Sequence, residues 1–147
     1  MANFDELNDH NHELTELSNV LMYLFQDREM LDTDTAYDLL YRFMGKFNEH
    51  IGQVDNLYHV LLSDRDERSN NTARMFMSGG QELKRIITQY TKAWCSNLHN
   101  GLQVADYKRF RNDSEEMFRM VLSRIQDETE HLYPLIRKLR GEARTAA

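Results

Sequence analysis

The sequence predicts an all-α protein, and three observations support this class. Apolar residues recur at alternating spacings of three and four, which is the period of a helix that buries one face. The 147 residues include only one proline and six glycines, so few positions interrupt a helix. Leu, Met, Glu and Arg, which favour helices, are plentiful. A chain of this length can bury its own core, so we assign residues 1–147 to one domain.

The first predicted helix covers residues 4–26 and ends at a polar turn, residues 27–29. One of its faces carries leucines at helical spacing, and His10 takes a position on that face where a leucine would fit. A single histidine on an apolar face is more often a hydrogen-bonded core residue than a metal ligand. His10 therefore gains meaning only together with residues on the other helices.

The second predicted helix covers residues 34–63. Thr33 or Asp34 can cap the free backbone N–H groups of its first turn. Its apolar face runs over several turns and is interrupted once, by His50. The charged stretch that follows is the predicted connection to the third helix.

The third and fourth predicted helices cover residues 72–99 and 104–140. Gly79 and Gly80 lie inside the third helix, where two glycines cost ~2 kcal/mol relative to alanine and would suit a close helix, a kink or a cavity. The fourth helix carries Glu128 on its apolar face. Pro134 removes a backbone donor and is expected to bend the last turns.

Short connections make neighbouring helices antiparallel, so the predicted architecture is an up-down-up-down antiparallel four-helix bundle. Residues 56–62 resemble residues 131–137, as expected if each half of the chain is one helical hairpin. Antiparallel helices place a residue opposite its mirror image across the turn. By this rule the unusual residues of all four helices fall near one level, namely His10, His50, Gly80, Arg124 and Glu128.

Composition argues against several classes of function. The 18 basic and 24 acidic residues give a net charge of −6 without a basic stripe, so no nucleic-acid partner is expected. The N-terminus lacks the pattern of a signal peptide, and no apolar run approaches the ~20 residues of a membrane span. We expect a cytoplasmic protein without a membrane partner. The single cysteine, Cys95, is expected to be a small buried hydrophobe beside Trp94.

The remaining histidines lie away from the apolar faces and are expected at the surface or its boundary. Glu128 and His131 have the spacing of a ferritin-type ligand pair, but no second pair of this kind is present, so chance explains it. The four histidines that lie away from the apolar faces are His12, His59, His99 and His131.

Histidine and carboxylate side chains that project from facing helices into a bundle core can hold iron or manganese. Here the residues resemble the hemerythrin-like, or HHE cation-binding, family over nearly the whole chain. The resemblance is carried by Asp9–His10, His50 with Asp55 and Leu57–Tyr58, and Glu128 with Leu132–Leu135.

This resemblance implies a non-haem di-iron centre that binds oxygen, nitric oxide or iron itself. It implies that His10 and His50 are ligands from the first two helices. Asp55 would be a bridging carboxylate, and Glu128 would be the carboxylate ligand of the last helix.

Two positions depart from the family pattern. Gly80 and Arg124 stand where the resemblance implies histidines, so the sequence predicts an incomplete di-iron site. An arginine is always charged and offers a metal no lone pair. Arg124 is also spaced to pair with Glu128 one turn later. The layer could therefore be a polar network that sets helix register without metal.

Two functional hypotheses follow. In the first, the chain is a hemerythrin-like iron- or cation-binding protein that binds or senses oxygen, nitric oxide or iron. In the second, it is a metal-free regulatory bundle whose outer faces dock a partner protein. Catalysis is less favoured than either, because no acid, base and nucleophile converge outside the candidate metal ligands. The oligomeric state is left open.

Overall fold

The computed structural model describes residues 4–95 and 106–146, which are helical throughout most of their length and contain no strand. The predicted all-α class is confirmed for this part of the chain. The elements are α1 (Phe4–Leu24), α2 (Arg28–Leu31), α3 (Asp34–Leu62), α4 (Glu67–Trp94), α5 (Tyr107–Asp127), the π-helical segment η2 (Glu128–Leu132) and α6 (Tyr133–Ala146).

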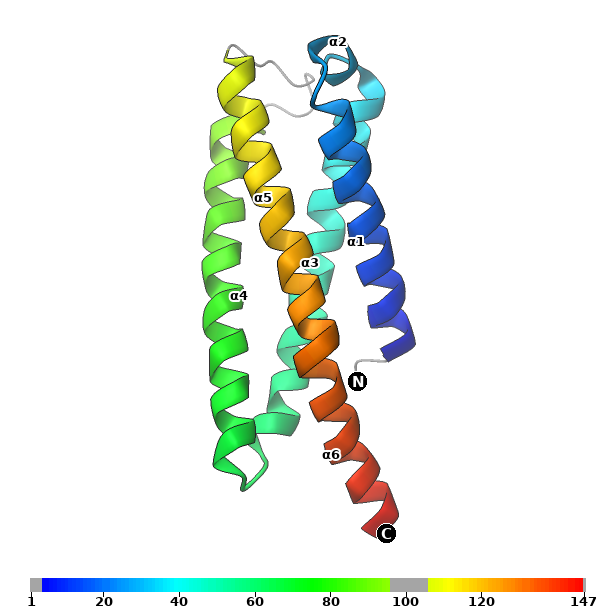
Figure 1. Cartoon of the computed structure of the whole chain (residues 1–147), viewed down its shortest axis with the longest axis vertical. Coiled ribbons are helices and arrows are strands. Elements are labelled where there is room, and N and C mark those ends of the chain that lie inside the picture. Colours follow the sequence, from blue (N-terminus) through cyan, green and yellow to red (C-terminus); the bar gives the residue numbers. More distant parts are fainter. Residues whose placement is uncertain (1–3, 96–105, 147) are drawn as a thin grey trace.

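The helices form an elongated bundle (Figure 1). Helix α1 packs against α3 and α5, and α4 packs against α3 and α5. Elements α5, η2 and α6 follow one another as a single long column. Within the described segments, no helix combines the length and the apolar character needed to cross a membrane.

The N-terminal half follows the predicted helices except at the first turn. Helix α1 ends at Leu24, and the polar turn predicted at 27–29 instead begins the four-residue helix α2. Asp27 caps α2, since its Oδ1 accepts a hydrogen bond from the Glu29 backbone N–H at 2.9 Å. The predicted Thr33 cap is confirmed, because its Oγ1 accepts from the Ala36 N–H at 3.2 Å.

The boundaries of α4 differ from the prediction of 72–99. Helix α4 begins at Glu67, inside the charged stretch that we predicted to be a connection. The Asp66 side chain caps it by accepting a hydrogen bond from the Arg68 N–H, so the acidic residues there start a helix. The helix ends at Trp94, and the predicted third turn lies in residues 96–105, outside the described residues.

The column formed by α5, η2 and α6 contains a widened turn at the predicted bend. Across η2 the Tyr133 backbone N–H donates to the carbonyl of Glu128, five residues earlier. Pro134 follows directly and brings no N–H, and its ring would crowd a carbonyl in the preceding α-helical turn. A π-type turn at this position relieves that crowding while the column continues.

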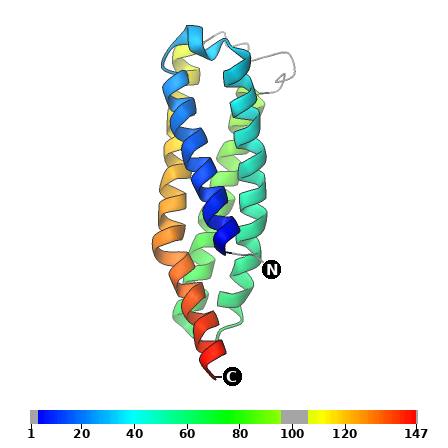
Figure 2. The ribbon, with the colours of Figure 1, turned by 90° about the vertical axis from the view of Figure 1, so that its right-hand side faces the viewer.

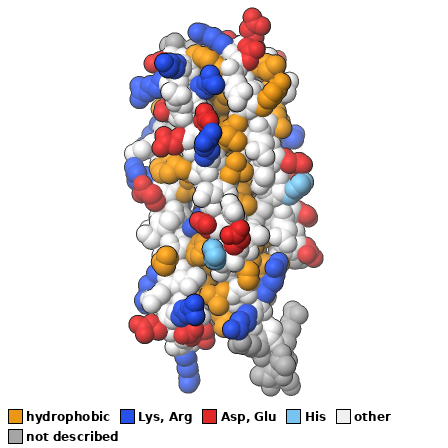
Figure 3. All heavy atoms as spheres, in the orientation of Figure 1, with side chains coloured by type: hydrophobic (Ala, Val, Ile, Leu, Met, Phe, Trp, Pro, Cys, Tyr) orange, Lys and Arg blue, Asp and Glu red, His pale blue; other side chains and the backbone are white. Residues whose placement is uncertain are grey.

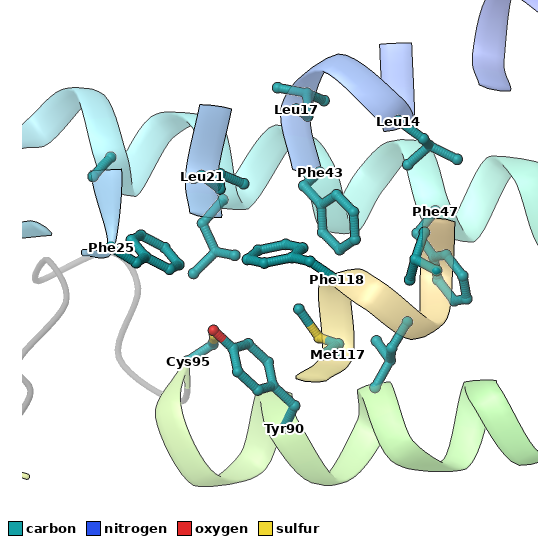
Figure 4. Close-up of a cluster of buried hydrophobic side chains, with 14 of the residues drawn as sticks. Leu14, Leu17, Leu21, Phe25, Phe43, Phe47, Tyr90, Cys95, Met117 and Phe118 are labelled. Atoms are coloured by element: carbon teal, nitrogen blue, oxygen red, sulfur yellow. The ribbon is translucent and has the colours of Figure 1, made fainter. Parts of the chain in front are cut away.

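Two clusters of buried apolar side chains form the core. The larger one lies between α1, α3, α4 and α5. Figure 4 shows rings from three of these elements meeting there, with Phe118 placed between Phe25 and Phe43. The centroids of Phe43 and Phe118 are 5.0 Å apart in an edge-to-face arrangement. Cys95 is buried in this cluster as predicted.

The second cluster lies toward the other end of the bundle. Its buried residues are Leu7 from α1, Val54, Leu57, Tyr58 and Leu61 from α3, Ala73 from α4, Leu132 from η2, and Tyr133 and Ile136 from α6. Between the two clusters in chain order lie the buried polar residues Asn11, His50 and Glu128. The core is therefore divided by a polar layer, which is where the functional candidates lie.

Candidate functional site

The centre of the polar layer is a direct contact between α3 and the last helical column. His50 Nε2 lies 2.7 Å from Glu128 Oε1, and the side chains are 2 % and 1 % exposed. With Glu128 as a carboxylate, which can only accept, His50 donates through Nε2. A buried carboxylate is costly unless it is paired, so Glu128 requires its partners. The sequence predicted both residues near one level of the bundle, and this contact agrees with that placement.

Arg124 supplies the second partner of Glu128. Its Nε donates to Glu128 Oε2 at 3.1 Å, so each carboxylate oxygen has its own partner. Its Nη2 donates to the Tyr58 hydroxyl at 2.7 Å and to the Phe76 carbonyl at 2.8 Å. The predicted pairing of Arg124 with Glu128 is thus part of a network that joins α3, α4 and α5.

Gly79 and Gly80 make room for this arginine. A Cβ atom on Gly79 would lie 3.1 Å from Arg124 Nη1, and one on Gly80 would lie 3.2 Å from Nη2. Both separations are tighter than ordinary contacts, so a side chain here would push the guanidinium away. Two of the alternatives suggested by the sequence apply in part, since α4 is closely approached here and Gly80 also lines a cleft. What approaches α4 is an arginine side chain.

Tyrosines frame the layer on the side of the second apolar cluster. Tyr58 is 4 % exposed and bonded to Arg124, and burial raises its pKa to about 12 although the arginine opposes this shift. Tyr133 is 1 % exposed and accepts a hydrogen bond from Asn11 Nδ2 at 3.1 Å. Burial, and then the charge of Glu128, raise the pKa of Tyr133.

Sequence reasoning did not select Asn11, Tyr58, Tyr133 or the Phe76 carbonyl as site residues. The internal repeat could have revealed the tyrosines, because they take matching places in residues 56–62 and 131–137. The spacing of apolar residues in the first helix pointed to His10 and not to its neighbour Asn11. The burial pattern of α1 passes from Leu7 through Asn11 to Leu14 and therefore misses His10.

The other two predicted ligands do not join the His50–Glu128 contact. His10 is 18 % exposed, and its Nδ1 lies 3.7 Å from Glu49 Oε2, beyond hydrogen-bond distance. Asp55 is exposed, because five residues along a helix turn it roughly 140° away from His50. The expectation that Asp55 faces the layer is wrong.

A cleft opens beside the layer, between α3 and α4. It has a volume of about 310 Å³, and Arg124 and Tyr58 contribute to its lining where Gly80 carries no side chain. Asp55, His59, Gln81 and Lys84 provide polar groups, and Ile51, Val54, Leu62 and Met77 provide apolar surface. The cleft therefore gives outside molecules a route to residues that contact the buried network.

The donor set does not fit a di-iron centre. Both oxygens of Glu128 are engaged, and one of their partners is a permanent cation that cannot coordinate a metal. Two imidazole nitrogens, Nδ1 of His10 and Nδ1 of His50, are buried without a hydrogen-bond partner. Among the residues that the structure describes, no group of three or more His, Cys, Asp or Glu side chains could hold a metal ion.

The peripheral histidines are placed largely as expected. His12 and His131 are 73 % and 68 % exposed, and His59 is exposed as well. His131 therefore points away from Glu128, which agrees with chance as the origin of their spacing. The prediction for His99 lies outside the described residues.

No protein-family model, no curated protein and no solved structure matches the chain. The hemerythrin-like resemblance therefore stays a prediction.

Proposed function

We propose that the chain is a metal-independent binding module, built as an up-down-up-down four-helix bundle of hemerythrin-like layout. The observation that carries this proposal is the guanidinium of Arg124 on Glu128 Oε2. A cation bonded to the one buried carboxylate of the layer takes the electrostatic role that a metal ion would have there. The network then holds α3, α4 and α5 in register without any ion.

The geometry favours binding over turnover. Most polar groups of the layer are hydrogen-bonded to one another, and no nucleophile is poised beside a base within the described residues. The cleft between α3 and α4 has a volume in the lower range of small-ligand sites. It leads to Arg124 and Tyr58, so a ligand bound in the cleft would contact residues of the network.

Metal analysis tests the proposal directly. The protein is produced in iron-supplemented cells, purified without chelator, and analysed for iron by mass spectrometry and for near-ultraviolet oxo-bridge absorption. We expect colourless protein with iron far below one per chain, and a melting temperature unchanged by iron or chelator. Two irons per chain, or one that chelator removes with a loss of stability, would overturn metal independence.

A variant supplies the positive control. Arg124→His removes the cation and places an imidazole one turn before Glu128, so it should raise the affinity for iron above that of the natural chain. Lys92→His, an exposed substitution on α4 away from the layer, should leave iron affinity unchanged. If Arg124→His gains nothing over Lys92→His, the layer is not a converted metal site.

A further inference from the structure

Helices α1 and α3 form one face of the bundle, and no described helix lies over it (Figure 2). A groove of about 600 Å³ runs between them. It is lined by Glu13, Glu16, Leu17 and Val20 from α1 and by Leu39, Arg42 and Lys46 from α3. We call these seven residues the α1–α3 groove.

Charge is segregated across the α1–α3 groove. Its two acidic residues, Glu13 and Glu16, both come from α1, and its two basic residues, Arg42 and Lys46, both come from α3. The face seen in Figure 3, a quarter turn away, differs, since it shows basic and acidic side chains intermixed over α4 and α5. A surface with one sign on each side complements a rotated copy of itself.

One exposed apolar side chain lines the groove, and a second lies beside it. Val20 is 44 % exposed, and Tyr23, one turn further along the same side of α1, is 64 % exposed. An exposed valine and tyrosine flanked by charges have the composition of a small interface, with an apolar centre and a polar rim. Covering them would remove apolar surface from water.

The charges of the groove are only partly used within one chain. Lys46 Nζ lies 3.3 Å from Glu13 Oε2 and 3.7 Å from Glu49 Oε2. Glu16 Oε1 lies 3.0 Å from His12 Nε2. The Lys46–Glu13 pair places these parts of α1 and α3 at the same height. Arg42 is exposed and, over the described residues, has neither an ion pair nor a hydrogen bond. An acidic partner from outside the chain would supply what Arg42 lacks.

We infer that the α1–α3 groove binds a second copy of this chain in a two-fold dimer. The two-fold axis runs parallel to the bundle axis, so α1 of each copy lies on α3 of the other at the same height. Glu13 and Glu16 of one copy then face Lys46 and Arg42 of its partner. The exposed side chains of the two Val20 residues lie at one height, about one helical turn beyond the charged residues.

The charge pattern selects this axis over the other possible one. A two-fold axis perpendicular to the bundle would place α1 on α1 and α3 on α3. The acidic residues of the two α1 helices would then face each other, and so would the basic residues of the two α3 helices. Contacts between like charges are unfavourable. Only the parallel axis sets each row against its opposite. This inference concerns a different face from the cleft and does not depend on the absence of metal.

Sedimentation velocity tests the dimer with two charge-reversed proteins. One carries Glu13→Lys and Glu16→Lys, so both rows are basic; the other carries Arg42→Glu and Lys46→Glu, so both rows are acidic. We expect the natural chain to dimerise at about 100 µM, in the range of weak interfaces, and each variant alone to be monomeric. An equimolar mixture of the two variants should form a heterodimer, because every row again meets its opposite.

Circular dichroism confirms that each variant is folded before it is mixed. Lys108→Glu with Arg111→Glu is the matched control, since it reverses two exposed basic residues of α5 outside the groove and should leave the dimer intact. Val20→Glu should disrupt the dimer at least tenfold without reversing either row. A monomeric natural chain at about 100 µM, a dimer that persists in both reversed variants, or variants that fail to pair on mixing would each overturn the inference.

Discussion

Arg124 is the residue on which the polar layer depends most, because it neutralises Glu128 and bonds to α3 and α4 at the same time. Arg124→Met keeps much of the side-chain volume but leaves a buried carboxylate with only His50. We expect it to lower the free energy of unfolding by about 3–5 kcal/mol, the usual loss when one partner of a buried ion pair is removed. Urea unfolding at neutral pH measures this loss.

A second substitution separates lost charge pairing from lost packing. Adding Glu128→Gln to Arg124→Met removes the unpaired charge and leaves an amide that His50 can still contact. The double variant should therefore recover most of the stability lost in Arg124→Met. If the losses of unfolding free energy caused by Arg124→Met and by Glu128→Gln simply add, the network is not held together by the ion pair.

Cys95 provides a residue-scale test of the core. Burial raises the pKa of its thiol to about 12, and the side chain is 6 % exposed. Because the thiolate is the reactive form, iodoacetamide at pH 8 should alkylate the folded protein more than about tenfold more slowly than the urea-unfolded protein. Mass spectrometry of timed samples follows the reaction. Equal rates would place the thiol in water.

At the scale of elements, the glycines of α3 and α4 have opposite roles. An added Cβ on Gly45 or Gly52 of α3 meets nothing within 4 Å, whereas one on Gly80 of α4 lies 3.2 Å from Arg124 Nη2. Gly45→Ala and Gly52→Ala should each stabilise the protein by about 0.5–1 kcal/mol through helix propensity. Gly80→Ala should lose most or all of that gain. Thermal unfolding compares the three, and an equal gain at Gly80 would mean that Arg124 moves freely.

Helix positions followed from the sequence because the apolar period runs over several turns of α1, α3, α4 and α5. Ends were harder to predict, since single caps decide them. Helix α2 has four residues, too few to show a period. The early start of α4 depends on Asp66, one acidic residue among several in that stretch.

The sequence predicted the height along the bundle at which the site residues lie, but not how each helix is rotated about its own axis. Antiparallel neighbours fix which residues share a height, and this brought His50 and Glu128 together correctly. Which side chain of a pair of neighbours faces inward depends on how each helix is turned by its packing. Sequence spacing therefore favoured His10 where Asn11 is buried, and it could not show the Phe76 carbonyl at all.

For the whole molecule, the polar layer divides one long core into two apolar clusters. Sliding one helix by a turn against its neighbours would part His50 from Glu128 and Asn11 from Tyr133. A buried network of this kind raises the cost of alternative registers, which apolar stripes alone distinguish weakly. The layer thus contributes to the choice of a single arrangement as well as to any binding role.

Buried tyrosines in both parts of the core link the stability of the whole molecule to alkaline pH. Burial raises the pKa of Tyr58 from 10.0 to about 12, and it raises the pKa of Tyr90 and Tyr133 as well. Since the folded pKa exceeds the unfolded one, the stability linked to Tyr58 is complete below pH 10 and is lost as pH rises through about 12. The urea concentration at the midpoint of unfolding should therefore fall as the pH rises through this window. Absorbance near 295 nm, an approximate tyrosinate wavelength, should show these three buried tyrosines ionising together with unfolding. Ionisation of Tyr58, Tyr90 and Tyr133 in a protein that stays folded would contradict their burial.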